Sequence, residues 1–255
     1  MNQLGLSAAY VMGTFIAGIA VDGNPAARIL VVRETMPEMM KPEPLTAEYA
    51  RRWVEKMQRS VAYLKQMQAR VVNMDWSMSE GELENQYTVS GIGKDTKARK
   101  EMAAEVYGIL KDGLNRAFAS APEILFVTAP YFCDEESGDA AGIPATVSLP
   151  NVFVVSTVDQ AGDETPQTCY GDAVHVHANG VEAESVVPGG EKITFSGMSI
   201  CTPHVTNLAA KLFALDPSLT PTKVSDLILK GADRSEDGQR VLINPKRTVA
   251  MLRDK

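Results

Sequence analysis

The chain has 255 residues, which is long enough for one α/β domain with a sizeable hydrophobic core. Its formal net charge is −7 and no basic stripe is visible, so nucleic acid is excluded as an expected partner. The three cysteines, Cys133, Cys169 and Cys201, show neither metal-site spacing nor a disulfide framework, and they allow at most one disulfide.

The first predicted element is an apolar helix over residues 4–21. This stretch lacks a basic leading segment and is interrupted by polar residues, so a buried helix is expected and not a signal peptide. Gly13, Ala17 and Gly18 favour a close approach of neighbouring elements. Elsewhere the sequence has no segment long and apolar enough to cross a membrane, and the cellular location stays open.

The next segments predict a strand, a loop and a helix. Arg28–Arg33 is a short apolar run after a Gly-Asn-Pro turn, which is typical of a buried parallel strand. Residues 36–44 are punctuated by proline and predict a loop. Thr46 then caps a long helix whose apolar residues share one face, namely Ala50, Trp53, Val54, Met57, Val61 and Leu64.

Strands and helices continue to alternate through the middle of the chain. Residues 70–77 predict a strand and its exit, and the polar residues 80–96 predict a surface insertion or a lengthened loop. A second amphipathic helix follows, and residues 123–129 predict another buried strand. This alternation predicts an α/β fold in three layers, with a mostly parallel central sheet and helices on both faces.

The last third of the chain contains two further features. His175 and His177 alternate along a predicted strand and share one face, but two ligands alone make a weak metal site, so none is expected. A Gly-rich turn at residues 196–199 leads into an apolar helix, in whose first turn Pro203 is tolerated. Ser199 therefore precedes a helix N-terminus, where backbone N–H groups can bind an anion. A final helix is predicted after Thr220.

This turn resembles the serine motif of the subtilisin family of serine peptidases, G-T-S-M-A-x-P-H-V. The residues that match are Gly197, Ser199, Pro203, His204 and Val205. The resemblance covers most of the chain and implies a single subtilisin-like α/β domain over residues 1–255. It also implies that Ser199 occupies the position of the nucleophile and that His204 is a structural residue of the helix.

Residues 12–18 are similar to the histidine motif of the same family, H-G-T-H-V-A-G. Met12 stands where the catalytic histidine belongs, and Phe15 replaces the second histidine. Without that histidine, nothing is placed to take the proton of Ser199. The family's catalytic aspartate lies on a strand before this motif, and this chain is expected to begin after it. Either a separate N-terminal fragment completes the sheet, or the sheet is rebuilt without it.

Two further segments resemble the family but depart at positions that face its cleft. Residues 70–77 are similar to V-I-N-M-S-[LW]-G, with Asp75 in place of the serine. Pro130, Tyr131 and Phe132 stand where the family has A-G-N, and a phenylalanine cannot donate a hydrogen bond to an oxyanion. By the resemblance, the residues expected to line a substrate site are Phe15, Trp76, Tyr131, Phe132, Met198 and Cys201.

Three functions remain open. The first is a subtilisin-like scaffold with no working peptidase. The second is an engineered site in which Asp75, its pKa raised by apolar neighbours, abstracts a proton from a small aromatic substrate. The third is a non-catalytic cleft for a peptide or a small aromatic ligand. No cofactor is expected, and calcium is implied by the resemblance alone, since no loop is assigned to it.

Overall fold

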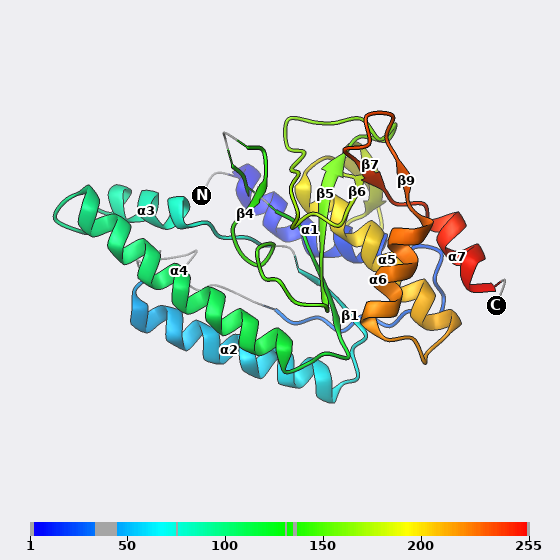
Figure 1. The fold of residues 1–255 in the computed structure, drawn as a ribbon, viewed down its shortest axis with the longest axis horizontal. Coiled ribbons are helices and arrows are strands. Elements are labelled where there is room, and N and C mark those ends of the chain that lie inside the picture. Colours follow the sequence, from blue (N-terminus) through cyan, green and yellow to red (C-terminus); the bar gives the residue numbers. More distant parts are fainter. Residues whose placement is uncertain (1–2, 34–44, 75, 131, 135–136, 254–255) are drawn as a thin grey trace.

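The computed structural model describes residues 3–33, 45–74, 76–130, 132–134 and 137–253 (Figure 1). Met36–Pro44, Asp75 and Tyr131 thus lie outside the described residues. The helices are α1 (Gln3–Val21), α2 (Ala47–Gln66), α3 (Glu80–Val89), α4 (Thr96–Ala119), α5 (Cys201–Leu215), α6 (Pro221–Gly231) and α7 (Pro245–Arg253).

The strands form one mostly parallel sheet and two hairpins. The sheet has the order β1 (Val71–Met74), β2 (Leu125–Thr128), β5 (Val152–Val158), β6 (Val176–Asn179), β10 (Val241–Leu242) and β9 (Asp233–Arg234). All neighbours in it are parallel except β9 and β10. The hairpins are β3 (Phe132–Cys133) with β4 (Ala140–Ala141), and β7 (Ala183–Val186) with β8 (Lys192–Phe195).

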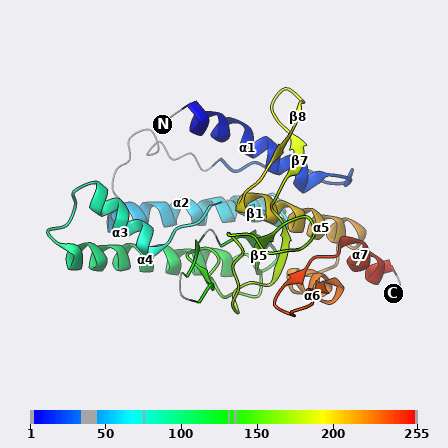
Figure 2. The same ribbon diagram turned by 90° about the horizontal axis from the view of Figure 1, so that it is seen from above.

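Helices cover both faces of this sheet, which confirms the predicted fold class. On one face, α2 and α4 pack over strand residues such as Met74, Phe126 and Val152; this is the first core cluster. On the other face, α5 and α6 pack over Leu125 and Phe153, in the second core cluster. Figure 2 shows α1 lying beside the β7–β8 hairpin, away from α4.

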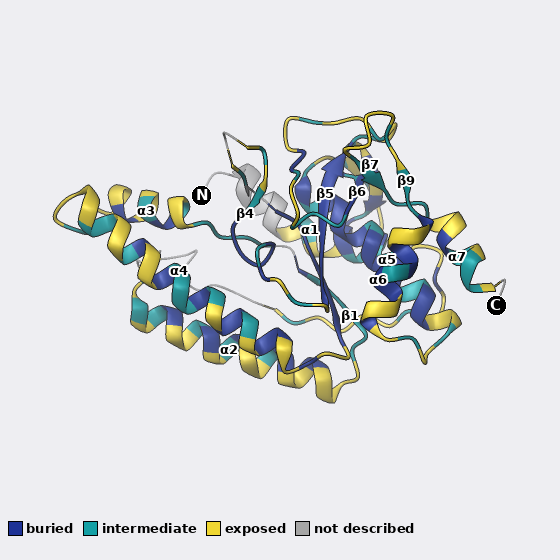
Figure 3. Cartoon of the chain, in the orientation of Figure 1, coloured by how far each residue is buried: buried dark blue, intermediate teal, exposed yellow. Residues whose placement is uncertain are grey.

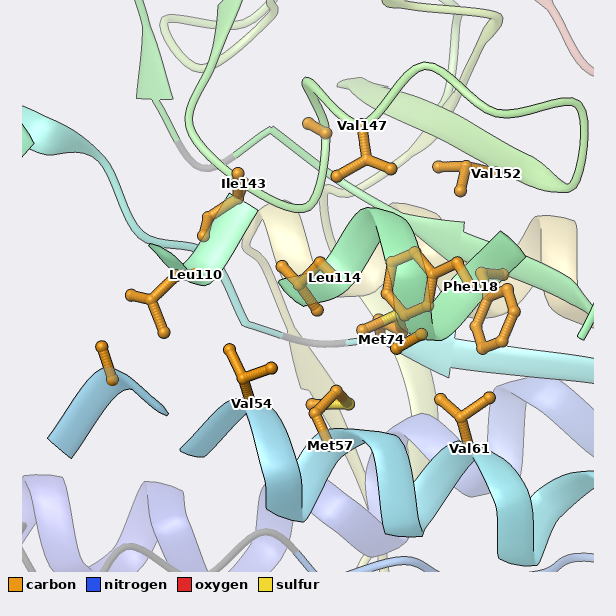
Figure 4. Close-up of a cluster of buried hydrophobic side chains, with 14 of the residues drawn as sticks. Val54, Met57, Val61, Met74, Leu110, Leu114, Phe118, Ile143, Val147 and Val152 are labelled. Carbon is orange, nitrogen blue, oxygen red and sulfur yellow. The ribbon is translucent and has the colours of Figure 1, made fainter. Parts of the chain in front are cut away.

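The predicted stripes on α2 and α4 are confirmed. The Thr46 hydroxyl caps α2 by accepting a hydrogen bond from the Tyr49 N–H at 3.1 Å. The apolar side chains of α2, among them Val54, Met57 and Val61, point toward Leu114 and Phe118 of α4 (Figure 4). Their opposite faces are exposed (Figure 3). Burial of these stripes, more than helix propensity, stabilises the pair.

Of the two alternatives predicted for residues 80–96, the lengthened loop is wrong for the first half, because Glu80–Val89 forms α3. The Ser79 hydroxyl caps this helix by accepting from the Glu82 N–H at 3.1 Å. Only Leu83 and Tyr87 are buried on α3. Two anchors one turn apart are too few to produce a visible apolar stripe, although they suffice to dock a short helix onto α4.

The prediction of a buried strand over Arg28–Arg33 was also wrong. The segment is not a strand, and Ile29, Leu30 and Val31 are 55%, 36% and 75% exposed. Only Val32 packs partly against the first core cluster. The physical reason is that a strand needs a hydrogen-bonded neighbour, and within the described part of the chain none pairs with this segment.

Covalent and close contacts fix the loops around the sheet. Cys133 and Cys169 form a disulfide, which is the single bond that the sequence allowed, and Cys201 is free and buried.

Gly18 of α1 faces Val186 of β7, where an added Cβ would lie 2.9 Å from the valine Cγ2. The predicted close approach of a neighbouring element is thus confirmed at Gly18. The same prediction is wrong for Gly13, around which there is open space.

Candidate functional site

Ser199 lies in a 3-10 turn, Met198–Ile200, which leads directly into α5. We call Gly197–Ile200 the serine turn. The Ile200 N–H donates to the Gly197 carbonyl at 3.0 Å, and the Thr202 hydroxyl donates to the Ser199 carbonyl at 3.3 Å. Ser199 therefore stands at the positive end of α5, as the sequence predicted.

The serine turn is tied to the carboxyl end of the sheet. The Gly197 N–H donates to the carbonyl of Gly180, just after β6, at 2.8 Å. A Cβ on Gly180 would lie 3.0 Å from the Gly197 carbonyl and would overlap with the Thr157 hydroxyl. Only glycine fits there, so Gly180 sets the distance between the sheet and the turn. Ligand sites of parallel sheets lie at this end.

Helix α1 brings Met12 and Phe15 to the same region. Phe15, Ile19, Ala183, Val187 and Ile200 form a third core cluster, and Met12 packs partly buried against it. Ile200 belongs to the serine turn, so this third core cluster joins the predicted histidine position to the predicted nucleophile position. The Ser185 hydroxyl donates to the Phe15 carbonyl at 2.7 Å and fixes α1 on β7.

Asn207 of α5 is a positioning residue that the sequence analysis missed. Its side-chain amide donates to the carbonyls of Ile19, Ala20 and Asp22 at 3.1, 3.2 and 2.8 Å, and so holds the C-terminal end of α1. The Ile19 carbonyl also accepts a hydrogen bond from the Asp22 N–H at 3.2 Å, and the Asn207 amide adds a donor at a helix end where carbonyls lack intrahelical partners. The available signal was a lone asparagine among the apolar residues of α5.

Polar side chains also meet where β1 and β2 end. The Thr206 hydroxyl of α5 donates to the Asn73 side-chain oxygen at 2.9 Å. Thr128, the last residue of β2, is fully buried, and its hydroxyl has no partner among the described residues. For Asn73 and Thr128, the sequence signal was a polar residue near the end of an otherwise apolar strand.

Two of the three histidines have ring contacts with the backbone, and burial affects all three. The Nδ1 atoms of His175 and His177 accept hydrogen bonds from the N–H groups of Val154 and Val241. Burial lowers the pKa of each of these rings. Burial also lowers the pKa of His204, and the nearby Asp22 carboxylate opposes that shift. Burial therefore disfavours the charged form of all three rings.

Of the remaining predicted site residues, Met198 and Cys201 adjoin Ser199 in the chain, whereas Trp76 and Phe132 belong to other segments. Trp76 packs edge-on against Trp53 of α2, with ring centroids 5.1 Å apart, in the first core cluster. Cys201 belongs to the second core cluster, where its Sγ lies 3.0 Å from the Met198 carbonyl. Met198 is buried in the serine turn, and the backbone of Phe132 begins β3. The role of these residues in binding stays a prediction.

Neither a metal site nor a membrane-spanning helix is found among the described residues. No group of three or more His, Cys, Asp and Glu side chains in the described ranges has the arrangement of a metal site. None of the helices, over the part of the chain described, is long and apolar enough to cross a membrane.

Comparison with known proteins gives a family match over most of the chain. The model of the subtilase family matches residues 13–244. A subtilisin from Bacillus pumilus is 28% identical over 117 residues, which are 46% of this chain and 42% of that protein. Subtilisin-like protease 2 from Pseudogymnoascus destructans is 28% identical over 176 residues, 64% of this chain and 43% of that protein. The chain thus matches less than half the length of either relative.

Solved structures agree on the fold. The MycP3 protease from the type VII (ESX-3) secretion system has a TM-score of 0.64 at 20% identity, covering 94% of this chain and 72% of that one. The self-cleaved protease domain of PatA has a TM-score of 0.63 at 20% identity, covering 96% of this chain and 84% of that one. At this level of identity, the likeness concerns the fold alone.

Proposed function

This chain belongs to the subtilase family, and on that premise we propose that it keeps the scaffold without working peptidase chemistry. The observation that carries the proposal is Met12, which packs against the third core cluster beside the serine turn. A thioether is a weak hydrogen-bond acceptor and cannot take the proton of Ser199. In subtilisin itself, loss of the histidine is known to cost about six orders of magnitude in turnover.

The histidines of this chain support the proposal. A substitute base must approach Ser199 from a neighbouring element. His175 and His177 instead accept backbone hydrogen bonds at and near β6. His204 is half-buried on α5, where its Nε2 finds no partner among the described residues. In His175 and His177 the Nδ1 atom is thus already engaged by a backbone donor.

Labelling with a fluorophosphonate tests the proposal, because this reagent reports an activated serine. We expect no labelling of Ser199 under conditions in which an active subtilisin is labelled fully, with Ser199→Ala as the blank. Labelling that disappears in Ser199→Ala would overturn the proposal. Labelling of Met12→His alone would instead locate the defect at the missing base.

Two alternatives carry their own tests. In the sequence, Asp75 directly follows Met74, which is the last residue of β1. Reactive groups gather at the carboxyl ends of the strands of a parallel sheet. If Asp75 is a general base, turnover of a small aromatic carbon acid disappears in Asp75→Asn. If the site only binds, a peptide or a small aromatic compound raises the unfolding temperature without being consumed.

A further inference from the structure

The last two strands of the sheet are joined to it at His177 of β6. Among the described residues, β10 pairs with β6 at one register position, where Leu242 lies opposite His177. The Val241 N–H donates to His177 Nδ1 at 3.2 Å, and the Ile243 N–H donates to the His177 carbonyl at 3.1 Å. β9 lies outside β10, at the edge of the sheet opposite β1 (Figure 1). His177 thus accepts both of these hydrogen bonds, one with its ring and one with its backbone.

The hydrogen bond to Nδ1 requires a neutral ring. An imidazole nitrogen accepts a hydrogen bond only while it carries no proton, and both nitrogens of a charged imidazole are donors. Proton uptake by His177 would therefore turn two N–H groups, those of Nδ1 and of Val241, toward each other. His177 is 3% exposed, so water cannot bind the charged ring while the strands stay paired.

The charged groups around His177 also oppose a second positive charge. Arg240 lies next to β10, and its side chain, 13% exposed, pairs with Glu164 Oε2 at 3.9 Å and with Asp237 Oδ2 at 3.4 Å. The Tyr170 ring lies 5.9 Å from the imidazole, and its hydroxyl donates to Glu164 Oε2 at 2.7 Å. Both carboxylates are thus engaged by Arg240 or Tyr170. Burial is the main cause that lowers the pKa of His177, the charge of Arg240 adds to it, and the neighbouring backbone opposes the shift.

We propose that His177 is a pH-sensitive switch for the β9–β10 edge of the sheet. When the ring takes up a proton, residues 241–243 separate from β6, water reaches the imidazole, and the rest of the sheet stays paired. The closed state is the one favoured at neutral and higher pH, because there the neutral ring accepts from Val241. This switch is independent of whether Ser199 reacts.

The edge is built so that it opens more readily than the core. Val241 and Ile243 are only partly buried against the second core cluster, and Leu242 packs on Gly162, where an added Cβ would lie 2.7 Å from the Leu242 Cδ1. β9 and β10 are joined to each other by their own antiparallel pairing, so they move as a unit. Segments with few buried apolar contacts open at a lower free energy than the core strands do.

Hydrogen exchange resolved by NMR tests the proposal, with the amides of Val241 and Ile243 as reporters. The reference is the amide of Phe126 in β2, which donates to the Asn151 carbonyl at 2.8 Å. Proton linkage gives the size of the effect. If the open ring titrates at its ordinary pKa of 6.5 and the closed ring stays neutral, the ratio of open to closed molecules rises about thirtyfold from about pH 7.5 to about pH 5. After correction for the intrinsic pH dependence of exchange, the reporters should exchange faster by that factor, and Phe126 should not.

His177→Gln offers a side-chain oxygen to the Val241 N–H and does not titrate in this range, so the rise should disappear in this variant. His175→Gln is the matched control, because it removes another buried ring whose Nδ1 accepts a backbone N–H, and it should keep the full rise. A flat profile of Val241 and Ile243 in the natural chain overturns the proposal without any variant. So does an equal rise in His177→Gln, a loss of the rise in His175→Gln, or an equal rise at Phe126, which would mean that the whole chain unfolds.

Discussion

The contact between α2 and α4 allows a sharp test of how the first core cluster is packed. Gly113 of α4 faces Val54 of α2, and a Cβ built on it would lie 2.5 Å from Cγ1 and 2.9 Å from Cβ of that valine. Gly108 lies on the same helix and has nothing within 4 Å of such a Cβ. Gly113→Ala and Gly108→Ala are therefore the same chemical change in two different surroundings.

The expected effects have opposite signs. Alanine gains roughly 0.5–1 kcal/mol over glycine inside a helix, so Gly108→Ala should raise the free energy of unfolding by that amount. Gly113→Ala has the same gain, but overpacking costs about 1–3 kcal/mol. The cost should lie near the upper end, because Val54 is β-branched and has one preferred χ1 rotamer in a helix. We expect a net loss of about 2 kcal/mol.

Urea unfolding followed by circular dichroism measures both variants. A third variant, Val54→Ala, removes the atoms that the new methyl group meets. In that background Gly113→Ala should cost less than in the natural chain, with a coupling free energy of about 1–2 kcal/mol. If Gly113→Ala and Gly108→Ala shift the urea midpoint equally and in the same direction, the close packing of α2 on α4 is wrong.

Three more predictions follow from individual contacts. Asn207→Ala removes the side-chain donor from three carbonyls at the end of α1, of which that of Ile19 keeps the Asp22 N–H, and should cost about 1–3 kcal/mol of unfolding free energy in urea; an unchanged midpoint would contradict this. Burial lowers the pKa of all three histidines below the ordinary value of 6.5, so at pH values below 6.5 the unfolded chain binds more protons than the folded chain. The free energy of unfolding should therefore fall as the pH drops from 6.5 toward 5, and His177→Gln should reduce this fall. The Cys133–Cys169 disulfide spans 36 residues. Its removal by Cys169→Ser should cost about 3–4 kcal/mol of unfolding free energy, measured by calorimetry. Reductant should destabilise the natural chain but not this variant, and an equal loss of stability in both would argue against the bond.

The helices were predictable where a stripe of apolar residues is long. α2 and α4 bury five or more residues each on one side, and that periodicity is visible in the sequence alone. α3 was missed because only Leu83 and Tyr87 anchor it. Arg28–Arg33 has the composition of a strand, but strand formation depends on a partner that composition does not reveal.

The resemblance predicts Ser199 and Met12 as site positions, and their roles stay predictions. The structure shows that the third core cluster brings α1 and the serine turn together. The neighbourhood of Trp76 was not predictable, because a tryptophan after a strand can face either layer, and here it packs on Trp53. Which cysteines pair likewise depends on proximity in space, so counting limited the number of disulfides without assigning one.

Met12, at the position that the resemblance gives to a histidine, allows a test of stability apart from activity. The methionine is partly buried and packs against the third core cluster. An imidazole placed there loses water without gaining an assigned hydrogen bond, which costs about 1–3 kcal/mol. Met12→Leu, which keeps the apolar volume, should cost less than about 1.5 kcal/mol. If Met12→His is as stable as Met12→Leu in urea, then this position accommodates an imidazole without a cost in stability, and the reasoning from burial is wrong.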